Sequence, residues 1–290
     1  MIPLRAEVWG SPIGHSRSPD LHHACYTQLG ISGNYSTREV TEENIAQEFA
    51  AHADTLTGIS LTMPLKTAIL NLVTGHRGDV TILRAANTAI KTDGEWWLTN
   101  TDPLGAAAML RRLVPSADSH VVLLGAGATA KSIVLGLHHV SFAGPLSVIV
   151  RSASRADDTR ALADSLGLAV SVMEFGALEE LPEASLVVST LPSGTALDDV
   201  DLAVLTRRVR ALMDVGYHPW PTPLADAFLT RGRDTHSGLP MLMFQALGQI
   251  RAFVAGDTSA PLADEAGALS AMATAVGLDP VWANPALMGQ

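Results

Sequence analysis

A glycine-rich turn between an apolar run and a helical pattern constrains the fold more than any other stretch of the chain. The apolar run Val121–Leu124 is followed by Gly125, Gly127 and Ala130 in the order G-x-G-x-x-A. Apolar residues then recur at helical spacing, at positions 133, 134 and 137. A strand, a glycine turn and a helix in this order are typical of a parallel α/β sheet that binds a dinucleotide. The alternative is an ordinary turn between a strand and a helix.

Each small residue of this turn has its own expected role. Gly125 permits a tight turn, Gly127 lets the backbone approach a pyrophosphate, and Ala130 lets the helix pack closely on the strand. The free N–H groups at the start of the helix would face the phosphates. The predicted cofactor-binding residues of the turn are Gly125, Ala126, Gly127, Ala128, Thr129 and Ala130.

The next predicted strand ends in basic residues. An NAD site would have an acidic residue after the strand Leu146–Val150, to accept hydrogen bonds from the ribose hydroxyls. This sequence has Arg151, Ser152 and Arg155 there. Because a guanidinium group binds phosphate oxygens in a fork, these residues favour the 2′-phosphate of NADP. The alternative is an ordinary solvated basic loop.

Composition excludes several classes of function. The chain has 290 residues, of which 47% are hydrophobic, and a net charge of −10, which argues against nucleic acid and anionic membranes as partners. Its single cysteine, Cys25, cannot form an internal disulfide, so we expect a buried thiol in a cytoplasmic protein. We find no membrane-spanning run and no signal-peptide pattern at the N-terminus. The histidine pairs at 22–23 and 138–139 lack metal-binding spacing, so we expect no metal.

Polar loops follow the predicted strands of the first hundred residues. The strand 6–10 leads into a loop that carries Ser16 and Ser18. Ser18 is predicted to be the N-cap of the next helix, with Pro19 in the first helical position. Two hydroxyl groups beside a helix N-terminus also suit a carboxylate ligand.

Two further loops have the same arrangement. The strand 58–62 is followed by a predicted helix with Lys66 in its first turn, where the helix dipole disfavours a cation. Lys66 therefore either has a functional role or points away into solvent. A hairpin with Asp93 and Gly94 as its turn leads to Asp102, the predicted N-cap of a helix over 104–113. Because ligands bind at the carboxyl ends of strands in α/β sheets, we expect these loops to share a site.

The order of the elements predicts two α/β domains. A Rossmann-type nucleotide-binding domain with a parallel sheet covers residues 104–238, and Thr190 and Gly238 are predicted to contact its cofactor. The remaining residues, 1–103 and 239–290, form an N-terminal α/β substrate domain that is completed by C-terminal helices.

The chain resembles the shikimate dehydrogenase family along nearly its whole length. The resemblance rests on eight motifs in the family's order: Gly10–Pro19 (GSPIGHSRSP), Thr62–Lys66 (TMPLK), Ala86–Thr88 (ANT), Asn100–Asp102 (NTD), Gly125–Gly127 (GAG), Ser189–Pro192 (STLP), Asp214–Tyr217 (DVGY) with Thr222–Leu224 (TPL), and Gln245–Ala246 (QA).

The resemblance implies a reversible hydride transfer, in which 3-dehydroshikimate and NADPH give shikimate and NADP in aromatic amino-acid biosynthesis. It implies that Lys66 and Asp102 form the catalytic pair. It further implies that Ser16 and Ser18 hold the substrate carboxylate with Tyr217 nearby. The residues implied to contact the ring hydroxyls and the reacting carbonyl are Thr62, Lys66, Asn87, Asp102 and Gln245.

The chemistry of the residues agrees with this catalytic pair. Hydride reduction of a ketone builds negative charge on its oxygen, so a cation or proton donor must lie there. A lysine supplies both, and an adjacent carboxylate can orient it; the sequence leaves open whether Lys66 or Asp102 delivers the proton. Three positions depart from the family pattern: Ser60 and Val150 stand where asparagine is usual, and Ala128 replaces a common glycine.

Two other functions compete with an NADP-dependent shikimate dehydrogenase. One is a quinate/shikimate dehydrogenase that prefers NAD, and Arg151 argues against it. The other is a non-catalytic NADP-binding regulator on the same fold, and the presence of both Lys66 and Asp102 argues against that. The expected partner is the small-molecule substrate, and the protein is expected to be a monomer or a homodimer.

Overall fold

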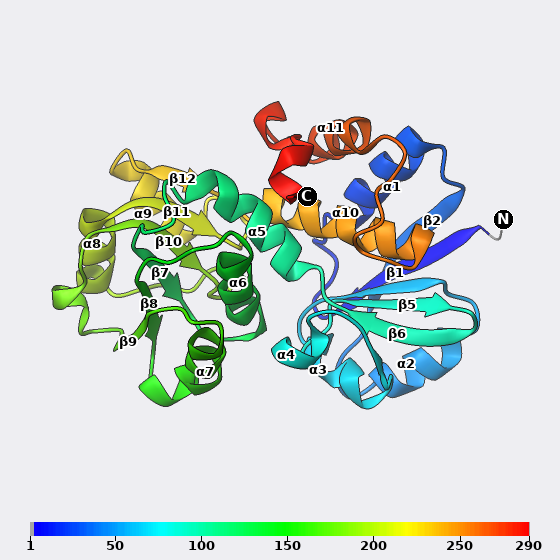
Figure 1. Cartoon of the computed structure of the whole chain (residues 1–290), viewed down its shortest axis with the longest axis horizontal. Coiled ribbons are helices and arrows are strands. Elements are labelled where there is room, and N and C mark those ends of the chain that lie inside the picture. The colour runs from blue at the N-terminus through cyan, green and yellow to red at the C-terminus, as the bar shows by residue number, and fades with distance from the viewer. Residues whose placement is uncertain (1–2, 290) are drawn as a thin grey trace. The chain divides into compact units, whose positions relative to one another are not determined.

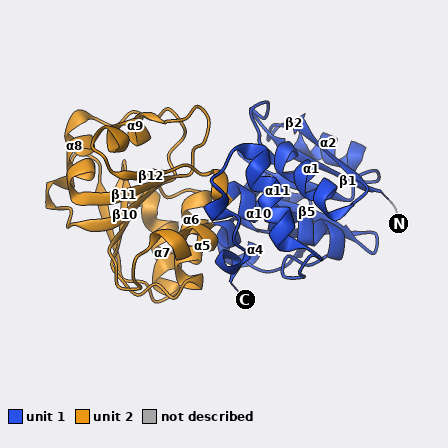
Figure 2. Cartoon of the chain, turned by 90° about the horizontal axis from the view of Figure 1, so that it is seen from above, with its two compact units in different colours: residues 1–105, 242–290 blue, residues 106–241 orange. Residues whose placement is uncertain are grey.

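The computed structural model describes residues 3–289 and contains two compact units. The first unit comprises residues 1–105 and 242–290, and the second comprises residues 106–241 (Figure 2). Helix α5 (Asp102–Leu113) and helix α10 (Leu239–Ala255) each run across a boundary between the units. The boundaries at 105 and 241 therefore lie inside helices, a few residues from the predicted limits of 103 and 239.

The second unit is built on a parallel sheet of the Rossmann type, which confirms the predicted fold (Figure 1). Its strands are β7 (Val121–Leu124), β8 (Leu146–Val150), β9 (Val170–Glu174), β10 (Ala184–Ser189), β11 (Val209–Asp214) and β12 (Asp234–His236). Their order is β12-β11-β10-β7-β8-β9, and every neighbouring pair is parallel. The direction of winding reverses between β7 and β10, the place where such sheets bind their ligands.

Four helices of the second unit pack on this sheet: α6 (Ala128–His139), α7 (Asp157–Ser165), α8 (Asp199–Arg208) and α9 (Pro223–Thr230). Side chains of α8 and α9, among them Leu205 and Phe228, form one core cluster with residues of β7, β10 and β11. Gly136 of α6 is packed tightly, because a Cβ atom there would lie 2.8 Å from Ala106 Cβ. The sequence patterns did not indicate α8, α9 or the three-residue strand β12.

The first unit has a mixed sheet in the order β2-β1-β3-β5-β6-β4. Its strands are β1 (Leu4–Gly10), β2 (Gly33–Glu39), β3 (Gly58–Leu61), β4 (Gly75–His76), β5 (Thr88–Thr92) and β6 (Glu95–Thr99). Strand β1 is parallel to β2 and β3, whereas β5 is antiparallel to both β3 and β6. Strand β6 therefore runs in the same direction as β1 and β3. The predicted hairpin turn is confirmed, with positive φ at Asp93 and Gly94.

Helices pack on both faces of this sheet: α1 (Ser18–Leu29), α2 (Ile45–His52), the short helices α3 (Leu65–Ala68) and α4 (Val80–Leu83), α10 and α11 (Glu265–Val276) (Figure 1). Ile45 of α2 lies in a core cluster with Trp9, Ile59 and other sheet residues. On α10, Phe253 packs against Gly58 of β3 so closely that no Cβ atom would fit there. Cys25 of α1 is buried and burial raises the pKa of its thiol to about 12, which confirms the prediction of an unreactive core thiol.

Two local predictions were wrong by one residue. Arg17, not Ser18, is the N-cap of α1, and Ser18 is the first helical residue. Asp102 is the first residue of α5 rather than its cap, and the carbonyl of Thr101 accepts the first helical hydrogen bond. At Ser18 and Asp102 the helix begins one residue earlier than predicted, a difference of the size that is common at helix ends. The predicted helix after Pro64 is confirmed as the short α3, which continues as a 3₁₀ turn over Ile69–Asn71.

An ion pair between the buried Arg251 and the half-buried Glu265 joins α10 to α11 in the first unit. Arg251 donates to both carboxylate oxygens of Glu265, at 2.6 and 2.7 Å. Burial alone would raise the pKa of Glu265, but the hydrogen bonds from Arg251 and from the Leu262 N–H hold it below its ordinary value. The folded state therefore favours the charged form of this carboxyl group.

We expect Arg251→Met to lower the free energy of unfolding by about 2 kcal/mol at neutral pH, because the change leaves a half-buried carboxylate without its cation. The pair stabilises the protein fully above the ordinary glutamate pKa of 4.5, and this stability is lost as the pH falls through the lower folded-state value. Denaturant titrations of both proteins at several pH values measure the difference, which should shrink in acid.

Arg160→Met is the matched control, because Arg160 and Asp157 form an exposed ion pair within α7. Its effect should stay below about 1 kcal/mol at every pH. An equally small effect of Arg251→Met would show that the pair of Arg251 and Glu265 does not hold α11 in place.

Candidate active site

The three polar loops of the first unit meet at one edge of its sheet. They follow β1, β3 and β6, which run in the same direction. The Ser11 N–H donates to the Met63 carbonyl at 3.0 Å, which ties the first loop to the second. A Cβ atom at Gly10 would collide with the Thr62 side chain, so this approach requires glycine.

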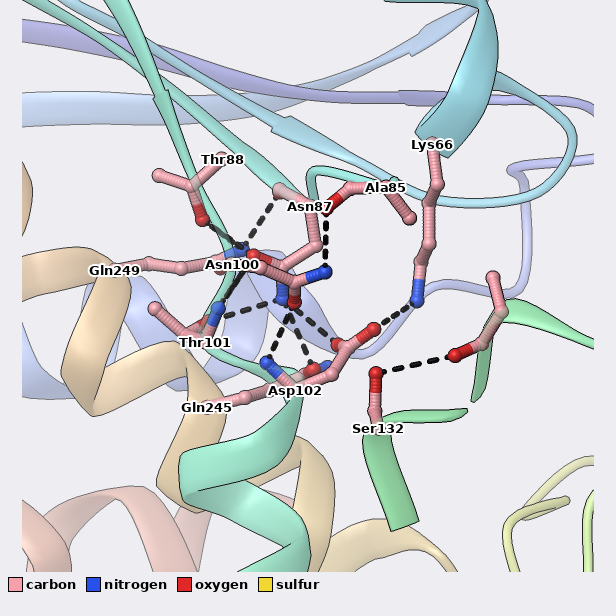
Figure 3. A network of polar contacts seen from close by, with 11 residues as sticks. Lys66, Ala85, Asn87, Thr88, Asn100, Thr101, Asp102, Ser132, Gln245 and Gln249 are labelled. Atoms are coloured by element: carbon pink, nitrogen blue, oxygen red, sulfur yellow. Dashed lines mark hydrogen bonds and ion pairs between the residues drawn. The ribbon is translucent and has the colours of Figure 1, made fainter. Parts of the chain in front are cut away.

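Lys66 and Asp102 form an ion pair between the second and third loops (Figure 3). The exposed fractions of their side chains are 18% and 3%. Helix α3 is a single turn of four residues, and the Lys66 ammonium group on it is neutralised by the Asp102 carboxylate. The alternative that Lys66 points away into solvent is therefore wrong.

Asn87, which precedes β5, binds the second oxygen of the Asp102 carboxylate (Figure 3). Its Nδ2 donates to Asp102 Oδ1 at 2.7 Å and to Gln245 Oε1 at 3.3 Å. Its Oδ1 accepts from the Thr101 N–H at 2.8 Å and from the Thr88 hydroxyl at 2.7 Å. Both carboxylate oxygens of Asp102 thus already accept hydrogen bonds, one from Lys66 and one from Asn87.

The structure brings Lys66, Asn87, Asp102 and Gln245 together among the predicted site residues. Thr62 lies on the second loop, where its carbonyl accepts from the Leu65 N–H at 2.8 Å. Asn87 forms hydrogen bonds with three further residues, Thr88, Thr101 and Gln249. The sequence analysis did not assign these three residues to the site. Thr88 and Thr101 stand within two of the motifs quoted above, whereas no local signal marked Gln249.

The predicted carboxylate-binding serines lie on the loop after β1 and at the start of α1. The Ser16 hydroxyl is half-buried and accepts from the Ser18 N–H at 3.3 Å, and Ser18 is buried. Tyr217 lies in the second unit, on the loop after β11, and is half-buried. Within residues 3–289 there is no group of three or more His, Cys, Asp and Glu side chains that would hold a metal ion.

The glycine turn of the second unit has the form that a pyrophosphate requires. Gly125 follows β7 with φ +97°, a conformation that side chains disfavour. Gly127 is the N-cap of α6, and no side chain caps this helix start. A Cβ atom at Gly127 would meet nothing within 4 Å, so open space lies in front of the helix N-terminus. These residues fit a dinucleotide phosphate group.

The other predicted cofactor residues lie at the carboxyl ends of neighbouring strands or close to them. Thr190 follows β10, and its hydroxyl donates to the Leu124 carbonyl at 2.8 Å. Arg151, Ser152 and Arg155 follow β8 and are exposed, and neither arginine forms an ion pair with a residue of the described range 3–289. At Gly238 a Cβ atom would overlap the Val215 carbonyl, so this glycine permits a close approach of two backbone segments.

Comparison with known proteins gives one consistent result. A sequence model described as the shikimate dehydrogenase substrate binding domain matches residues 8–89. A shikimate dehydrogenase (NADP(+)) from Nitrobacter winogradskyi is 35% identical over 246 residues, which cover 82% of this chain and 86% of that protein. The chain belongs to the shikimate dehydrogenase family.

Solved structures of shikimate dehydrogenases have the same fold. The crystal structure of the Mycobacterium tuberculosis shikimate dehydrogenase matches with a TM-score of 0.79 at 32% identity, covering 95% of this chain and 99% of that one. The Thermus thermophilus shikimate 5-dehydrogenase, in complex with NADP(H) and shikimate, matches with a TM-score of 0.76 at 26% identity, covering 94% and 99%. Residues 3–289 contain no helix that is long and apolar enough to cross a membrane.

Two glycines of the same turn should respond differently to alanine. Gly125→Ala forces a side chain into a left-handed conformation and places its Cβ atom 2.6 Å from Thr190 Oγ1, so we expect it to destabilise the protein by about 1–3 kcal/mol. Gly127→Ala meets no atom and should leave the melting temperature within a few tenths of a degree or raise it. Differential scanning fluorimetry measures both.

Gly127→Ala should instead weaken cofactor binding, because its methyl group fills the space in front of α6. A loss of about 1.4 kcal/mol would appear as a tenfold rise in the Kd for NADP, measured by calorimetry. Unchanged NADP binding by a folded Gly127→Ala protein would show that this turn does not hold the pyrophosphate.

Proposed function

We propose that the protein is an NADP-dependent shikimate dehydrogenase, which reduces 3-dehydroshikimate to shikimate with NADPH and catalyses the reverse reaction. The observation that carries this proposal is the ion pair of the half-buried Lys66 with the buried Asp102, held by Asn87 at the edge of the sheet where the polar loops meet. A half-buried lysine in a polar site suits a reaction that builds negative charge on a carbonyl oxygen.

Lys66 is proposed to stabilise that oxygen and to be the source of its proton. The ammonium group has three N–H donors, of which Asp102 accepts one among the described residues. Asp102 orients the ammonium group by accepting its hydrogen bond on one carboxylate oxygen. Asn87 holds Asp102 by donating to the other carboxylate oxygen. NADPH, when bound, supplies the hydride. In shikimate oxidation the same lysine receives the proton from the hydroxyl group.

The substrate-binding residues are proposed from the resemblance together with their positions. Ser16 and Ser18 would hold the carboxylate, and Tyr217 is proposed as a further substrate-binding residue. Thr62, Asn87 and Gln245 would bind the ring hydroxyls, since each presents a hydroxyl or carboxamide group. We propose residues 1–103 and 239–290 as the substrate domain, and a monomer or homodimer in the cytoplasm as the working form.

Residues of the second unit are proposed to hold the cofactor. The turn Gly125–Ala130 would bind the pyrophosphate, with Thr190 and Gly238 beside it. Arg151, Ser152 and Arg155 would bind the 2′-phosphate, because their side chains are exposed and both guanidinium groups are free of ion pairs within residues 3–289. The predicted cofactor domain is residues 104–238.

The function is tested by absorbance at the nicotinamide band with shikimate or quinate and with NADP or NAD. We expect turnover with shikimate and NADP. A preference for quinate and NAD would favour the quinate/shikimate dehydrogenase instead. Binding of NADP without turnover of either substrate would favour the non-catalytic regulator.

Lys66→Met should lower kcat for shikimate by about 10² or more, with a smaller change in KM, because it removes the proton donor at the reacting oxygen. Steady-state kinetics on folded protein measure the effect. Lys91→Met is the control, since Lys91 is a half-buried lysine of the same unit that donates to the Ala53 carbonyl. A variant at position 66 with near-normal kcat would remove Lys66 from the mechanism.

Arg151→Ala should weaken NADP binding about ten- to a hundredfold. A charge-assisted hydrogen bond contributes roughly 1.5–3 kcal/mol, and every 1.4 kcal/mol is about tenfold in affinity. The KM for NAD should change far less, because NAD has no 2′-phosphate. Both cofactors are assayed at saturating shikimate.

Arg160→Ala, an exposed arginine on the following helix, is the control for the loss of one positive charge. Equal losses in kcat/KM for NADP and NAD in Arg151→Ala would show that Arg151 does not recognise the phosphate.

A further inference from the structure

A hydrogen-bonded chain of buried polar side chains leads to the proposed catalytic pair in the first unit. Tyr35, Ser60, Gln249, Thr88 and Asn87 are each at most 5% exposed. Tyr35 lies on β2, Ser60 on β3 and Gln249 on α10, so this hydrogen-bonded chain joins elements that are far apart in sequence. Figure 3 shows its last part, where the Gln249 side chain reaches Thr88 and the backbone of Asn87.

The direction of each hydrogen bond in this series of side chains can be assigned from a group that can only accept. The carbonyl of Asn87 is only an acceptor, and it lies 3.1 Å from Gln249 Nε2. The carboxamide of Gln249 therefore presents its nitrogen to Asn87 and its oxygen to the Ser60 hydroxyl, at 3.0 Å. The Ser60 hydroxyl donates to Gln249 and accepts from the Tyr35 phenol at 2.7 Å.

The environment of Tyr35 keeps it a donor. Burial raises the pKa of this phenol, so it stays protonated. His22 stacks on its ring with centroids 3.6 Å apart, and burial lowers the pKa of His22 to about 3, so the imidazole is neutral. This end of the chain thus consists of uncharged groups with a fixed hydrogen-bond direction.

The same direction continues to the proposed catalytic pair. Gln249 Nε2 donates to the Thr88 hydroxyl at 3.2 Å, so the single proton of that hydroxyl is directed to Asn87 Oδ1 at 2.7 Å. With its oxygen occupied by Thr88 and by the Thr101 N–H, Asn87 points its NH₂ group at Asp102. Every donor from Tyr35 to Asn87 therefore favours the same orientation of the Asn87 carboxamide.

We propose that Gln249 is a positioning residue for the reaction: through the Thr88 hydroxyl and the Asn87 backbone it holds the Asn87 carboxamide in the orientation that supports Asp102 and, through Asp102, Lys66. Ser60 and Tyr35 hold Gln249 in turn. This inference rests on the proposed function, and none of these three residues is proposed to touch the substrate. The competing role for Gln249 is structural, namely to fasten α10 to the sheet.

The test compares Gln249→Met, which keeps the size of the side chain and removes its hydrogen bonds, with Thr88→Val. Each variant should lower kcat for shikimate by about ten- to a hundredfold, the scale of a misplaced catalytic group, with KM for shikimate and NADP nearly unchanged. Thr88→Ser keeps the hydroxyl and should restore most of kcat. The combined variant should lose no more than the larger single loss, because both changes break the same path.

Ser147→Ala is the matched control. Ser147 is a buried strand serine of the other unit, where its hydroxyl pairs with Ser171 at 3.1 Å and with His120 at 2.9 Å. Ser147→Ala removes buried side-chain hydrogen bonds, as Gln249→Met and Thr88→Val do, and it should keep the wild-type kcat. A structural role predicts lower melting temperatures for Gln249→Met and Thr88→Val with a wild-type kcat per folded molecule, and that result would overturn the proposal.

A second measurement separates this inference from the proposed function. The side-chain amide signals of Asn87 in an NMR spectrum, assigned by their loss in Asn87→Asp, should shift in Gln249→Met and Thr88→Val but not in Ser147→Ala. If the wild-type protein does not oxidise shikimate with NADP, the proposed function is refuted. The NMR spectrum then still tests whether Gln249 positions the Asn87 carboxamide. Unshifted Asn87 signals in both variants would refute the positioning alone.

Discussion

The ion pair of Lys66 and Asp102 is the interaction on which the first unit's polar interior depends. A carboxylate with a 3% exposed side chain is unstable unless donors surround it, and removing one partner of such a pair commonly costs several kcal/mol. Lys66 and Asn87 supply those donors. Asn87 does so only with its NH₂ group turned toward Asp102, so the side chains around Asn87 are constrained as well. One buried charge thus determines the orientation of groups on several loops and on α10.

Patterns within a few residues of one another were enough to predict much of the architecture. The glycine turn after Val121–Leu124 and the hairpin at Asp93 and Gly94 have positive φ angles that few other residues adopt, so their sequences indicate their structures. The meeting of the polar loops followed from the rule that parallel strands end at one edge. The contact of Gln249 with Ser60 joins residues 189 positions apart, and no local pattern indicates such a pair. The wrong cap assignments at Ser18 and Asp102 have a related cause, because a backbone can begin a helix one residue earlier when a side chain is used elsewhere.

Glycine has two different uses in the second unit. At Gly125 the backbone needs a positive φ and closely approaches Thr190, so the residue is required by the fold itself. At Gly127 the backbone is extended and a side chain would meet no protein atom, so the fold does not require glycine there. A small residue that the protein's own packing does not need, at an uncapped helix N-terminus, points to a ligand that needs the space.

In the second unit a buried carboxylate has hydrogen-bond donors and no ion-pair partner within residues 3–289. Asp214, at the end of β11, is 3% exposed, and burial raises the pKa of its carboxyl group. The Thr222 hydroxyl donates to it at 2.6 Å and the Gly216 N–H at 3.0 Å. Thr222 is also the N-cap of α9, where its hydroxyl accepts from the Ala225 N–H at 3.1 Å. These hydrogen bonds join the two ends of the loop that carries Tyr217. Hydroxyl and N–H donors are thus sufficient to hold the buried Asp214, whereas the buried Asp102 of the first unit has a lysine as its partner.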